Sequence, residues 1–469
     1  MKTFFISVVL FFCFFVLAMG VERPNVVLVL IDDMGWSDLS CFGNKSIQTP
    51  NIDRLAKEGI SFTQFYVCSP LCSPSRCGLT TGQYPQRWRI TSYLDNRKRN
   101  EQRGVAQWLD LSAPLLPKLL REAGYKTGHF GKWHLGGQRD VGDAPLITEY
   151  GFDESLTNFE GLGSRILPLL DAFDGTVPRK HALGSDNLGR GEIQWVKRNQ
   201  VTDAYVRKSL EFIKKAEKEG KPFYVNLWTD DVHSPFFPSK ELRGDGGKRT
   251  RYCGVLTELD GQLAPLFDYI RNSDSLSKNT LIILLSDNGP EVGAGSSAPL
   301  RGSKGTLYEG GVRSPLIVWG NGIIEPEQKG KKNNKVIFQS IDLVPSLLKI
   351  TNSNNAKITN TNNAKEAKTV FDGEDFSDVL LGRKIDKLRE APIFWQRPPD
   401  RPRAAGEVLP DLALRKGQWK FLIQFDGSKP QLYNLELDAT ESNNLAQTEP
   451  ELVKKFTNLL KNWTTNLKK

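Results

Sequence analysis

The chain contains little of what marks several common classes of protein. It has only six cysteines and four histidines in 469 residues, and no two cysteines form a Cys-x-x-Cys pair. Structural zinc sites are commonly built from such pairs, so their absence argues against a zinc-binding module. No internal repeat is present, which excludes a fold built from repeats. After residue 20 no stretch is apolar enough to span a bilayer, so the mature chain is expected to be soluble.

The positive charge is spread along the chain and forms no continuous basic stripe. The net charge is +9, with lysine and arginine clusters at residues 97–99, at residues 329–335 and at the C-terminus. Scattered lysines of this kind usually form a solvated surface, and no nucleic-acid motif accompanies them. The sequence therefore predicts no nucleic-acid partner. A moderately basic protein would still associate faster with a polyanion.

Residues 1–20 have the composition of a secretory signal peptide. One lysine precedes an apolar run from Phe4 to Met19, and the run ends near Gly20. A membrane anchor is the alternative, but the run is short for one. The sequence predicts export to the periplasm or the extracellular space, or to the lysosomal and secretory route in a eukaryote. Export permits disulfides among the five remaining cysteines, whose spacing assigns no pairing: Cys41, Cys68, Cys72, Cys77 and Cys253.

Apolar runs alternate with amphipathic segments over residues 21–370. The run from Pro24 to Ile31 is typical of a strand that is buried on both faces of a parallel sheet. Further strands are predicted at residues 61–67, 125–130, 222–228 and 280–285, and helices at residues 49–59, 73–82, 114–123, 203–219 and 255–271. This alternation predicts an α/β domain, with a mostly parallel sheet flanked by helices. Residues 86–112 are polar and irregular and are predicted to be an inserted loop.

A smaller unit is predicted at residues 371–469. A connector rich in Asn, Lys and Thr, residues 351–368, precedes it. Short strands separated by turns are predicted at residues 393–395, 412–416, 419–425 and 431–434, followed by a helix over residues 449–463. These elements indicate an α+β subdomain with an antiparallel sheet.

The stretch from Ser69 to Gly82 places a thiol beside an arginine at a helix start. Ser73 is a good N-cap, Pro74 suits the first helical position and Gly82 can close the helix. Cys72 would then lie just before a helix N-terminus, where an anion is favoured, with the Arg76 charge one turn away. The pattern indicates a nucleophile in an anion-binding site. A small buried residue or half of a disulfide is the alternative that this stretch alone leaves open.

Polar pairs follow two of the predicted strands. Asp32 and Asp33 follow the first strand, and Asp287 and Asn288 follow the strand at residues 280–285. Active sites of parallel α/β sheets lie at the carboxyl ends of strands, so the two pairs are expected to meet. Three carboxylates and an amide are hard oxygen ligands suited to calcium. Each pair alone would more commonly be a helix cap or a turn.

The motif Cys72-x-Pro74-Ser75-Arg76, followed by residues 79–82 of sequence Leu-Thr-Thr-Gly, resembles the signature of the type I sulfatases. The resemblance implies an alkaline-phosphatase-like large domain. It also implies that a sulfatase-maturing enzyme converts Cys72 to Cα-formylglycine. One Ca²⁺ ion, with Mg²⁺ as a possible substitute, is then expected on the modified Cys72, Asp32, Asp33, Asp287 and Asn288.

Three further motifs match the same family. They are Gly-Lys-Trp-His at residues 131–134, His-Ser-Pro at residues 233–235 and Arg-Gly-Ser-Lys-Gly at residues 301–305. A sulfate ester is anionic, so its site needs cations, here Arg76, Lys132, Lys304 and the metal. By resemblance, a hydroxyl of the formylglycine hydrate attacks sulfur while His233 and Lys304 help the alcohol to leave. His134 then takes a proton as sulfate is expelled.

Residues 229–235 and 251–260 are most similar to the branch of arylsulfatase A and N-acetylgalactosamine-6-sulfatase. This resemblance implies a carbohydrate sulfatase, exo-acting on 6-O-sulfated galactose or N-acetylgalactosamine. Substrate contacts are expected from loops at residues 86–112, 151–200 and 396–407. The candidate contact residues are Arg179, His181, Trp195, Asp230 and Arg301, with Arg397, Arg401 and Arg403 in the last loop.

Two other functions stay open at this point. One is a phosphonate or phosphate monoesterase of the same superfamily, because some of these enzymes also use formylglycine. The other is an inactive relative that binds polysaccharide. His129 and His181 lie outside the matched motifs, and each is expected to have a structural or substrate-contacting role.

Overall fold

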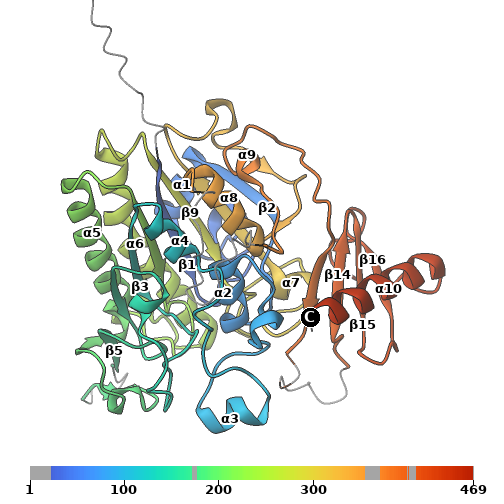
Figure 1. Cartoon of the computed structure of the whole chain (residues 1–469), viewed down its shortest axis with the longest axis horizontal. Helices are drawn as coiled ribbons and strands as arrows, with labels where there is room; N and C mark the ends of the chain where they lie inside the picture. Colours follow the sequence, from blue (N-terminus) through green and yellow to red (C-terminus); the bar gives the residue numbers. More distant parts are fainter. Residues whose placement is uncertain (1–22, 172–176, 354–369, 399, 401–407, 468–469) are drawn as a thin grey trace, which may run out of the picture.

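The computed structural model describes residues 23–171, 177–353, 370–398, 400 and 408–467 (Figure 1). The predicted signal peptide and residues 354–368 of the predicted connector lie outside these ranges. Within them, no helix is long and apolar enough to cross a membrane.

The larger sheet has twelve strands in the main order β11-β2-β10-β9-β1-β8-β3-β4-β5-β6, with β12 beside β2 and β7 beside β5. Its strands are β1 Asn25–Ile31, β2 Ile60–Tyr66, β3 Lys126–Gly131, β4 Glu154–Thr157, β5 Arg165–Leu170, β6 Arg179–Lys180, β7 Ile193–Lys197, β8 Phe223–Trp228, β9 Thr280–Ser286, β10 Arg313–Trp319, β11 Lys332–Asn333 and β12 Phe338–Gln339.

The helices are α1 Pro50–Glu58, α2 Cys72–Thr81, α3 Arg97–Gln102, α4 Leu116–Glu122, α5 Val201–Lys218, α6 Lys248–Asn272, α7 Glu309–Val312, α8 Leu343–Ile350, α9 Ser377–Leu380 and α10 Pro450–Asn466. The predicted loop at residues 86–112 thus contains a short helix, α3.

The centre of the sheet is parallel, as its β-branched apolar runs predict. Val29 of β1 pairs with Leu227 of β8 on one side and with Leu284 of β9 on the other. Strand β10 is antiparallel to both β9 and β2, so β2 runs in the same direction as β1. The carboxyl ends of β1, β2, β3, β8 and β9 therefore lie at one edge. The predicted mostly parallel α/β fold is confirmed.

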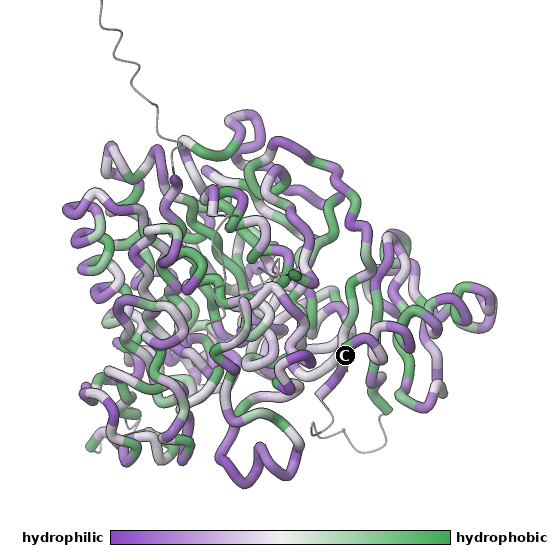
Figure 2. The backbone as a smooth tube through the Cα atoms, in the orientation of Figure 1, coloured by the Kyte–Doolittle hydropathy of each residue, from purple (hydrophilic) through white to green (hydrophobic). Residues whose placement is uncertain are grey.

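Helices cover both faces of this sheet, and the alternation along β1 shows how. Val27, Val29 and Ile31 pack in a core with α1, α5 and α6, whereas the residues between them pack in a second core with α2, α4 and α8. Successive side chains of a strand point to opposite faces, so a strand covered on both sides is apolar throughout. Figure 2 shows hydrophobic chain concentrated in these central strands and hydrophilic chain at the periphery, including α3.

The region at residues 151–200, expected to supply substrate-contacting loops, also contains four strands that the sequence did not predict. It contributes β4, β5, β6 and β7, which extend the sheet at one end. The strands are short, β6 has only two residues, and both of these are exposed. A strand as short as β6 carries too little apolar alternation to be read from sequence.

The C-terminal region forms the predicted antiparallel sheet. Its order is β13 Ile393–Gln396, β14 Leu412–Lys416, β15 Trp419–Ile423 and β16 Gln431–Asn434. Helix α10 packs on it through Phe456 and Leu460, which share a core with Phe421. In Figure 1 this small sheet lies beside the large domain, next to α7.

A buried ionic cluster joins the small sheet to the large domain. Lys420 Nζ of β15 lies 2.8 Å from Glu309 Oε1 of α7 and 3.1 Å from Glu441 Oε1. Glu441 Oε2 also accepts a hydrogen bond of 2.7 Å from the Glu309 backbone N–H. All three side chains are fully buried. Two carboxylates therefore share this lysine in a setting where charge is costly.

This cluster predicts a pH-dependent stability. Burial raises the pKa of Glu441 from its ordinary 4.5 to about 7, with Lys420 opposing and Glu309 adding to the shift. Between these pH values the folded chain holds a proton that the unfolded chain releases, so the free energy of unfolding should fall as pH rises from 4.5 to 7. Urea unfolding across this range measures the slope. Glu441→Gln is expected to make it shallower, and an unchanged slope would contradict the assignment to Glu441.

Candidate active site

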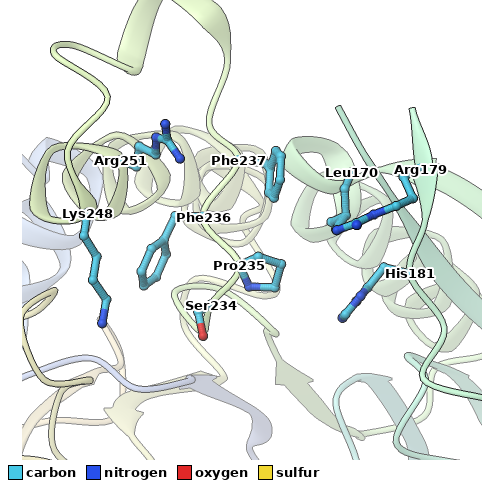
Figure 3. A pocket seen from close by; sticks show the side chains of 9 residues that line it. All are labelled: Leu170, Arg179, His181, Ser234, Pro235, Phe236, Phe237, Lys248 and Arg251. Atoms are coloured by element: carbon cyan, nitrogen blue, oxygen red, sulfur yellow. The ribbon is translucent and has the colours of Figure 1, made fainter. Parts of the chain in front are cut away.

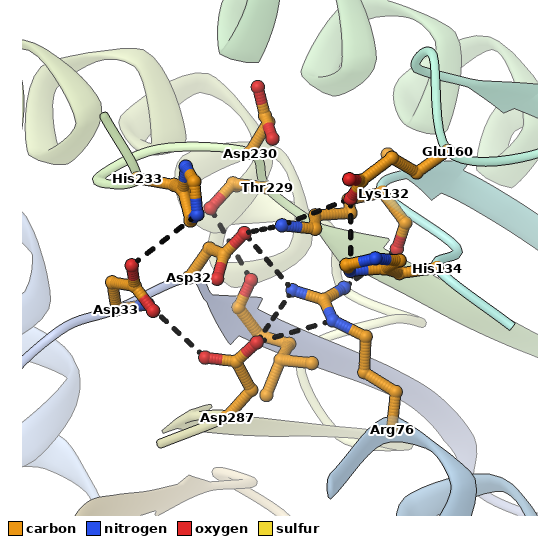
Figure 4. Close-up of polar contacts among 12 residues, drawn as sticks. Asp32, Asp33, Arg76, Lys132, His134, Glu160, Thr229, Asp230, His233 and Asp287 are labelled. Atoms are coloured by element: carbon orange, nitrogen blue, oxygen red, sulfur yellow. Dashed lines mark hydrogen bonds and ion pairs between the residues drawn. The ribbon is translucent and has the colours of Figure 1, made fainter. Parts of the chain in front are cut away.

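The polar residues that follow the central strands converge at one edge of the sheet (Figure 4). Asp32 and Asp33 follow β1, Lys132 and His134 follow β3, and Asp230 and His233 follow β8. Asp287 and Asn288 follow β9. All except His233 are buried, and His233 keeps 30% of its side-chain surface exposed. The structure thus brings together the predicted catalytic and metal-binding residues.

Cys72 is the first residue of α2, and not the residue before it as the sequence predicted. The N-cap is Leu71, which makes no side-chain capping hydrogen bond. Ser73, the predicted N-cap, instead accepts a hydrogen bond of 2.9 Å from the Leu94 backbone N–H. Gly82 closes the helix in the left-handed conformation at φ 66°, as predicted. Burial raises the pKa of the Cys72 thiol, so as a thiol it is a poor nucleophile.

All five cysteines among the described residues are free thiols. The possible disulfides are therefore absent from this part of the chain. Cys68 and Cys77 are both buried, and burial raises the pKa of the Cys68 thiol to about 12.

Arg76 is fixed from several directions. Its Nη2 lies 2.9 Å from Asp287 Oδ2 and 3.5 Å from Asp32 Oδ2. Its Nη1 donates a hydrogen bond of 2.7 Å to the Lys132 carbonyl, and the guanidinium lies 5.4 Å from the centre of the Trp228 ring. A buried arginine held this way presents its charge without reorganisation.

Two lysines complete the cationic side of the site. Lys132 Nζ is 2.6 Å from Asp32 Oδ2, and Lys304 Nζ is 2.6 Å from Asp33 Oδ2. Burial opposes the charge on Lys304, but Asp33 and Asp32 outweigh it and raise the pKa of this lysine. Both side chains therefore stay charged at neutral pH.

The carboxylates suit a divalent cation. Ligand atoms of Asp32, Asp33 and Cys72 lie within 4.8 Å of one another. Asp32 Oδ1 and Asn288 Oδ1 are buried without a hydrogen-bond partner. Burial, followed by the nearby Asp32 carboxylate, raises the pKa of Asp287 well above its ordinary value. Unpaired oxygens and crowded carboxylates in one place are what a bound Ca²⁺ or Mg²⁺ would satisfy.

His134 is held by residues that the sequence did not single out. Its Nε2–H donates a hydrogen bond of 2.9 Å to the carbonyl of Leu94, and its Nδ1 lies 3.0 Å from Glu160 Oε2. Glu160 Oε2 is also 3.2 Å from Lys132 Nζ. His134 has φ 53° and Asp33 has φ 58°, a left-handed conformation that costs non-glycine residues about 1–3 kcal/mol and recurs at functional sites.

Glu160→Gln is expected to lower kcat by about tenfold to a hundredfold, because the charged partner of both His134 and Lys132 is lost. Asp171→Asn is a suitable control, since Asp171 pairs with Arg243 outside this cluster. Steady-state kinetics and thermal unfolding of both variants check the prediction. Equal activity in the two variants would assign Glu160 a role in packing only.

The candidate substrate contacts divide into two groups. Arg179 and His181 line a pocket of about 520 Å³ beside Ser234 and Pro235. Asp230 lies buried in the charged cluster, where its Oδ1 accepts a hydrogen bond of 3.1 Å from Asn158.

Trp195 and Arg301 are not brought to that pocket. The Trp195 ring lies under Lys180, whose Nζ is 4.6 Å from the ring centre. The Arg301 guanidinium stacks on Tyr308 and donates hydrogen bonds of 3.2 Å to Tyr433 Oη and 3.1 Å to the Glu441 carbonyl.

Three other predicted contacts and one histidine are placed as follows. Arg397 is 1% exposed, which leaves little of it to meet a sugar, and Arg401 and Arg403 lie outside the described residues. His129 is buried among Trp133, Phe152 and Trp228. Burial lowers the pKa of His129 to about 3, so it is a neutral structural residue.

Sequence reasoning also missed Arg198. Its Nη1 lies 2.7 Å from Asp231 Oδ1, and its Nη2 donates a hydrogen bond of 3.2 Å to the His233 carbonyl. Arg198 therefore fixes the segment that carries His233. Nothing in the local sequence around it marks this role.

Taken together, this sheet, the buried anion-binding residues at its strand ends and the small C-terminal sheet define an enzyme of the alkaline-phosphatase-like class. Residues 24–353 match the Sulfatase family, and the chain belongs to that family.

Individual relatives support the same assignment. The chain is 33% identical to the N-acetylgalactosamine-6-sulfatase of Rattus norvegicus over 413 residues, covering 85% of this chain and 71% of that protein. It is 30% identical to the arylsulfatase A of Homo sapiens over 447 residues, covering 92% of this chain and 80% of that protein. The predicted family and branch are thereby confirmed.

Solved structures agree. The crystal structure of Ps i-CgsB in complex with k-i-k-neocarrahexaose superposes with a TM-score of 0.73 and 26% identity, covering 94% of this chain and 93% of that one. The phosphonate monoester hydrolase of Agrobacterium radiobacter shares the fold, with a TM-score of 0.64 and 20% identity, covering 95% and 96% of the two chains.

Proposed function

We propose that this sulfatase removes sulfate from 6-O-sulfated galactose or N-acetylgalactosamine at the end of a glycan. The observation that carries the proposal is the convergence of Cys72 with Arg76, Lys132 and Lys304 on a shared group of buried carboxylates. A sulfate monoester needs this combination, because its negative charge repels a nucleophile unless cations surround it. The choice of sugar is supported by the similarity to N-acetylgalactosamine-6-sulfatase.

Two groups complete the proposed site. One divalent cation would be held jointly by five side chains: those of Asp32, Asp33, Asp287, Asn288 and the residue at position 72. Conversion of Cys72 to Cα-formylglycine would supply an aldehyde hydrate, with one hydroxyl to attack sulfur and a second through which sulfate is released. An unmodified thiol has no second hydroxyl for that release.

The remaining residues have separable roles. Arg76 and Lys132 neutralise the sulfate oxygens from the side of α2 and β3. His233 Nδ1–H donates a hydrogen bond of 2.7 Å to the Ser234 carbonyl, which leaves Nε2 to exchange a proton with the leaving oxygen. That Nε2 lies 3.6 Å from Asp33 Oδ2, close to Lys304. His134, held by Leu94 and Glu160, accepts the proton of the second hydroxyl.

Mass spectrometry and a substrate panel test the proposal together. The peptide that contains Cys72 should carry the aldehyde in protein from its native host, and this protein should release sulfate from 6-sulfated galactose or N-acetylgalactosamine. A persistent thiol, or release of phosphate or phosphonate without sulfate, would overturn it. Activity on sugars sulfated only at other positions would replace the proposed substrate and leave the chemistry intact.

We also propose that residues 1–20 direct export of the chain. Their composition supports this, and sequencing the N-terminus of protein recovered from the periplasm or culture medium tests it.

A further inference from the structure

A pocket lies beside the segment that follows His233. Ser234 and Pro235, which follow His233 directly, form part of its lining, so the pocket adjoins the proposed position of the leaving alcohol. Its volume of about 520 Å³ is within the usual range for pockets that hold small ligands. The lining residues are Leu170, Arg179, His181, Ser234, Pro235, Phe236, Phe237, Lys248 and Arg251.

Apart from Ser234, the polar residues of this pocket have basic side chains, and they form two rims. Figure 3 shows Arg179 and His181 on one side and Lys248 and Arg251 on the other, with Phe236 and Phe237 between them. The two rims come from different parts of the chain, β6 and its neighbourhood on one side and the first turn of α6 on the other. No carboxylate is among the lining residues.

The two rims differ in how their charge is compensated. Lys248 Nζ lies 2.8 Å from Glu291 Oε1 and donates a hydrogen bond of 2.7 Å to the Val292 carbonyl. Arg179, by contrast, is exposed and makes no ion pair with any residue in the described part of the chain. Its charge is therefore available to an anion that enters the pocket.

We propose that this pocket binds the part of the glycan beyond the sulfated sugar, and that Arg179 selects glycans in which the neighbouring sugar carries a carboxylate or a second sulfate. This inference rests on the proposed function, because it takes the reacting sugar to lie at His233. The half-buried Phe237 offers an apolar face to a sugar ring, and the basic rims suit its anionic group.

Strand β6 offers a matched control for this proposal. Arg179 and Lys180 are adjacent, both are exposed and both are cationic, but successive residues of a strand point to opposite sides. Arg179 lines the pocket, whereas Lys180 lies over the Trp195 ring. Alanine at either position removes one positive charge from the same strand, so long-range electrostatic effects are matched.

The experiment compares two disaccharides that carry the same terminal 6-sulfated N-acetylgalactosamine, one linked to a uronic acid and the other to a neutral hexose. Wild-type enzyme should have a kcat/KM for the uronic acid disaccharide that is about fivefold higher, in the range of an exposed ion pair. Arg179→Ala should bring this ratio close to one, and Lys180→Ala should leave it unchanged. An equal ratio in all three proteins would overturn the inference.

A binding measurement separates this inference from the proposed function. Titration calorimetry with the desulfated disaccharides needs no turnover and should show the same preference for the uronic acid, lost in Arg179→Ala. If the enzyme binds the uronic acid disaccharide preferentially but releases sulfate from neither sulfated disaccharide, only the proposed chemistry is contradicted. Sulfate release from both disaccharides without any binding preference would contradict only the role of the pocket.

Discussion

Cys72→Ala is expected to lower sulfate release by at least about 10⁴-fold, because the side chain at position 72 supplies the proposed nucleophile and no other group at the site replaces it. The surrounding cations are already held by carboxylates, Arg76 by Asp287 and Lys132 by Asp32, so the site should stay assembled without the thiol. Kinetics with a 6-sulfated monosaccharide measure the loss, and circular dichroism with thermal unfolding confirms that the variant folds.

Two further variants sharpen this test. Cys72→Ser keeps the size of the side chain, and sulfate release by it should be as low as by Cys72→Ala unless the maturing enzyme accepts serine. Cys253→Ala removes another free thiol, half-buried on α6, and should retain full activity. If Cys72→Ala keeps more than about a hundredth of the wild-type rate, the proposed nucleophile is wrong, since losing a covalent nucleophile costs far more than that.

Removal of the divalent cation is the second change with a large expected effect. The carboxylates of Asp32, Asp33 and Asp287 are fully buried close together, and a bound cation would offset the repulsion between their negative charges. Extraction with a chelator should abolish sulfate release and also lower the melting temperature. At a Ca²⁺ concentration of 100 times its Kd, the metal would contribute about 2.7 kcal/mol to stability.

The melting temperature gives this prediction a readout that does not depend on formylglycine. In wild-type protein the melting temperature should rise with added Ca²⁺, and in Asp33→Asn this rise should be much smaller. Glu160→Gln serves as the control, because Glu160 lies in the same cluster and is outside the proposed ligand set. If the melting temperature of the wild-type protein does not change with added Ca²⁺ or Mg²⁺, the prediction of a divalent cation at this site is wrong.

The parts of the site that could be predicted from sequence share a physical cause. Asp32, His233 and Asp287 each follow an apolar run that is typical of a buried strand, and Lys132 follows the less apolar strand β3. Parallel strands bring their carboxyl ends together at one edge of the sheet. Local pattern and topology thus fix where these residues meet. The motif around Cys72 adds the nucleophile, although the helix begins two residues earlier than its serine and proline suggest.

Other parts depend on contacts that no local pattern encodes. Glu160 reaches His134 and Lys132 from a glycine-rich turn between β4 and β5, and Leu94 contributes only its backbone. The pair Glu309 and Lys420 joins residues that are 111 positions apart. In each case the two partners meet only when the chain is folded. In the sequence, each of these residues therefore looks like an ordinary surface residue or loop position.

The complete burial of α2 sets an order of events during biosynthesis. All ten residues of this helix are enclosed, and Cys72 is 3% exposed. A maturing enzyme that must bind the chain around Cys72 can reach this residue only before α2 is buried in the folded protein. The proposed modification therefore competes in time with folding, and the fraction of active molecules follows the ratio of the two rates. A cell that synthesises the chain faster than the maturing enzyme can modify it would accumulate folded protein that is permanently inactive.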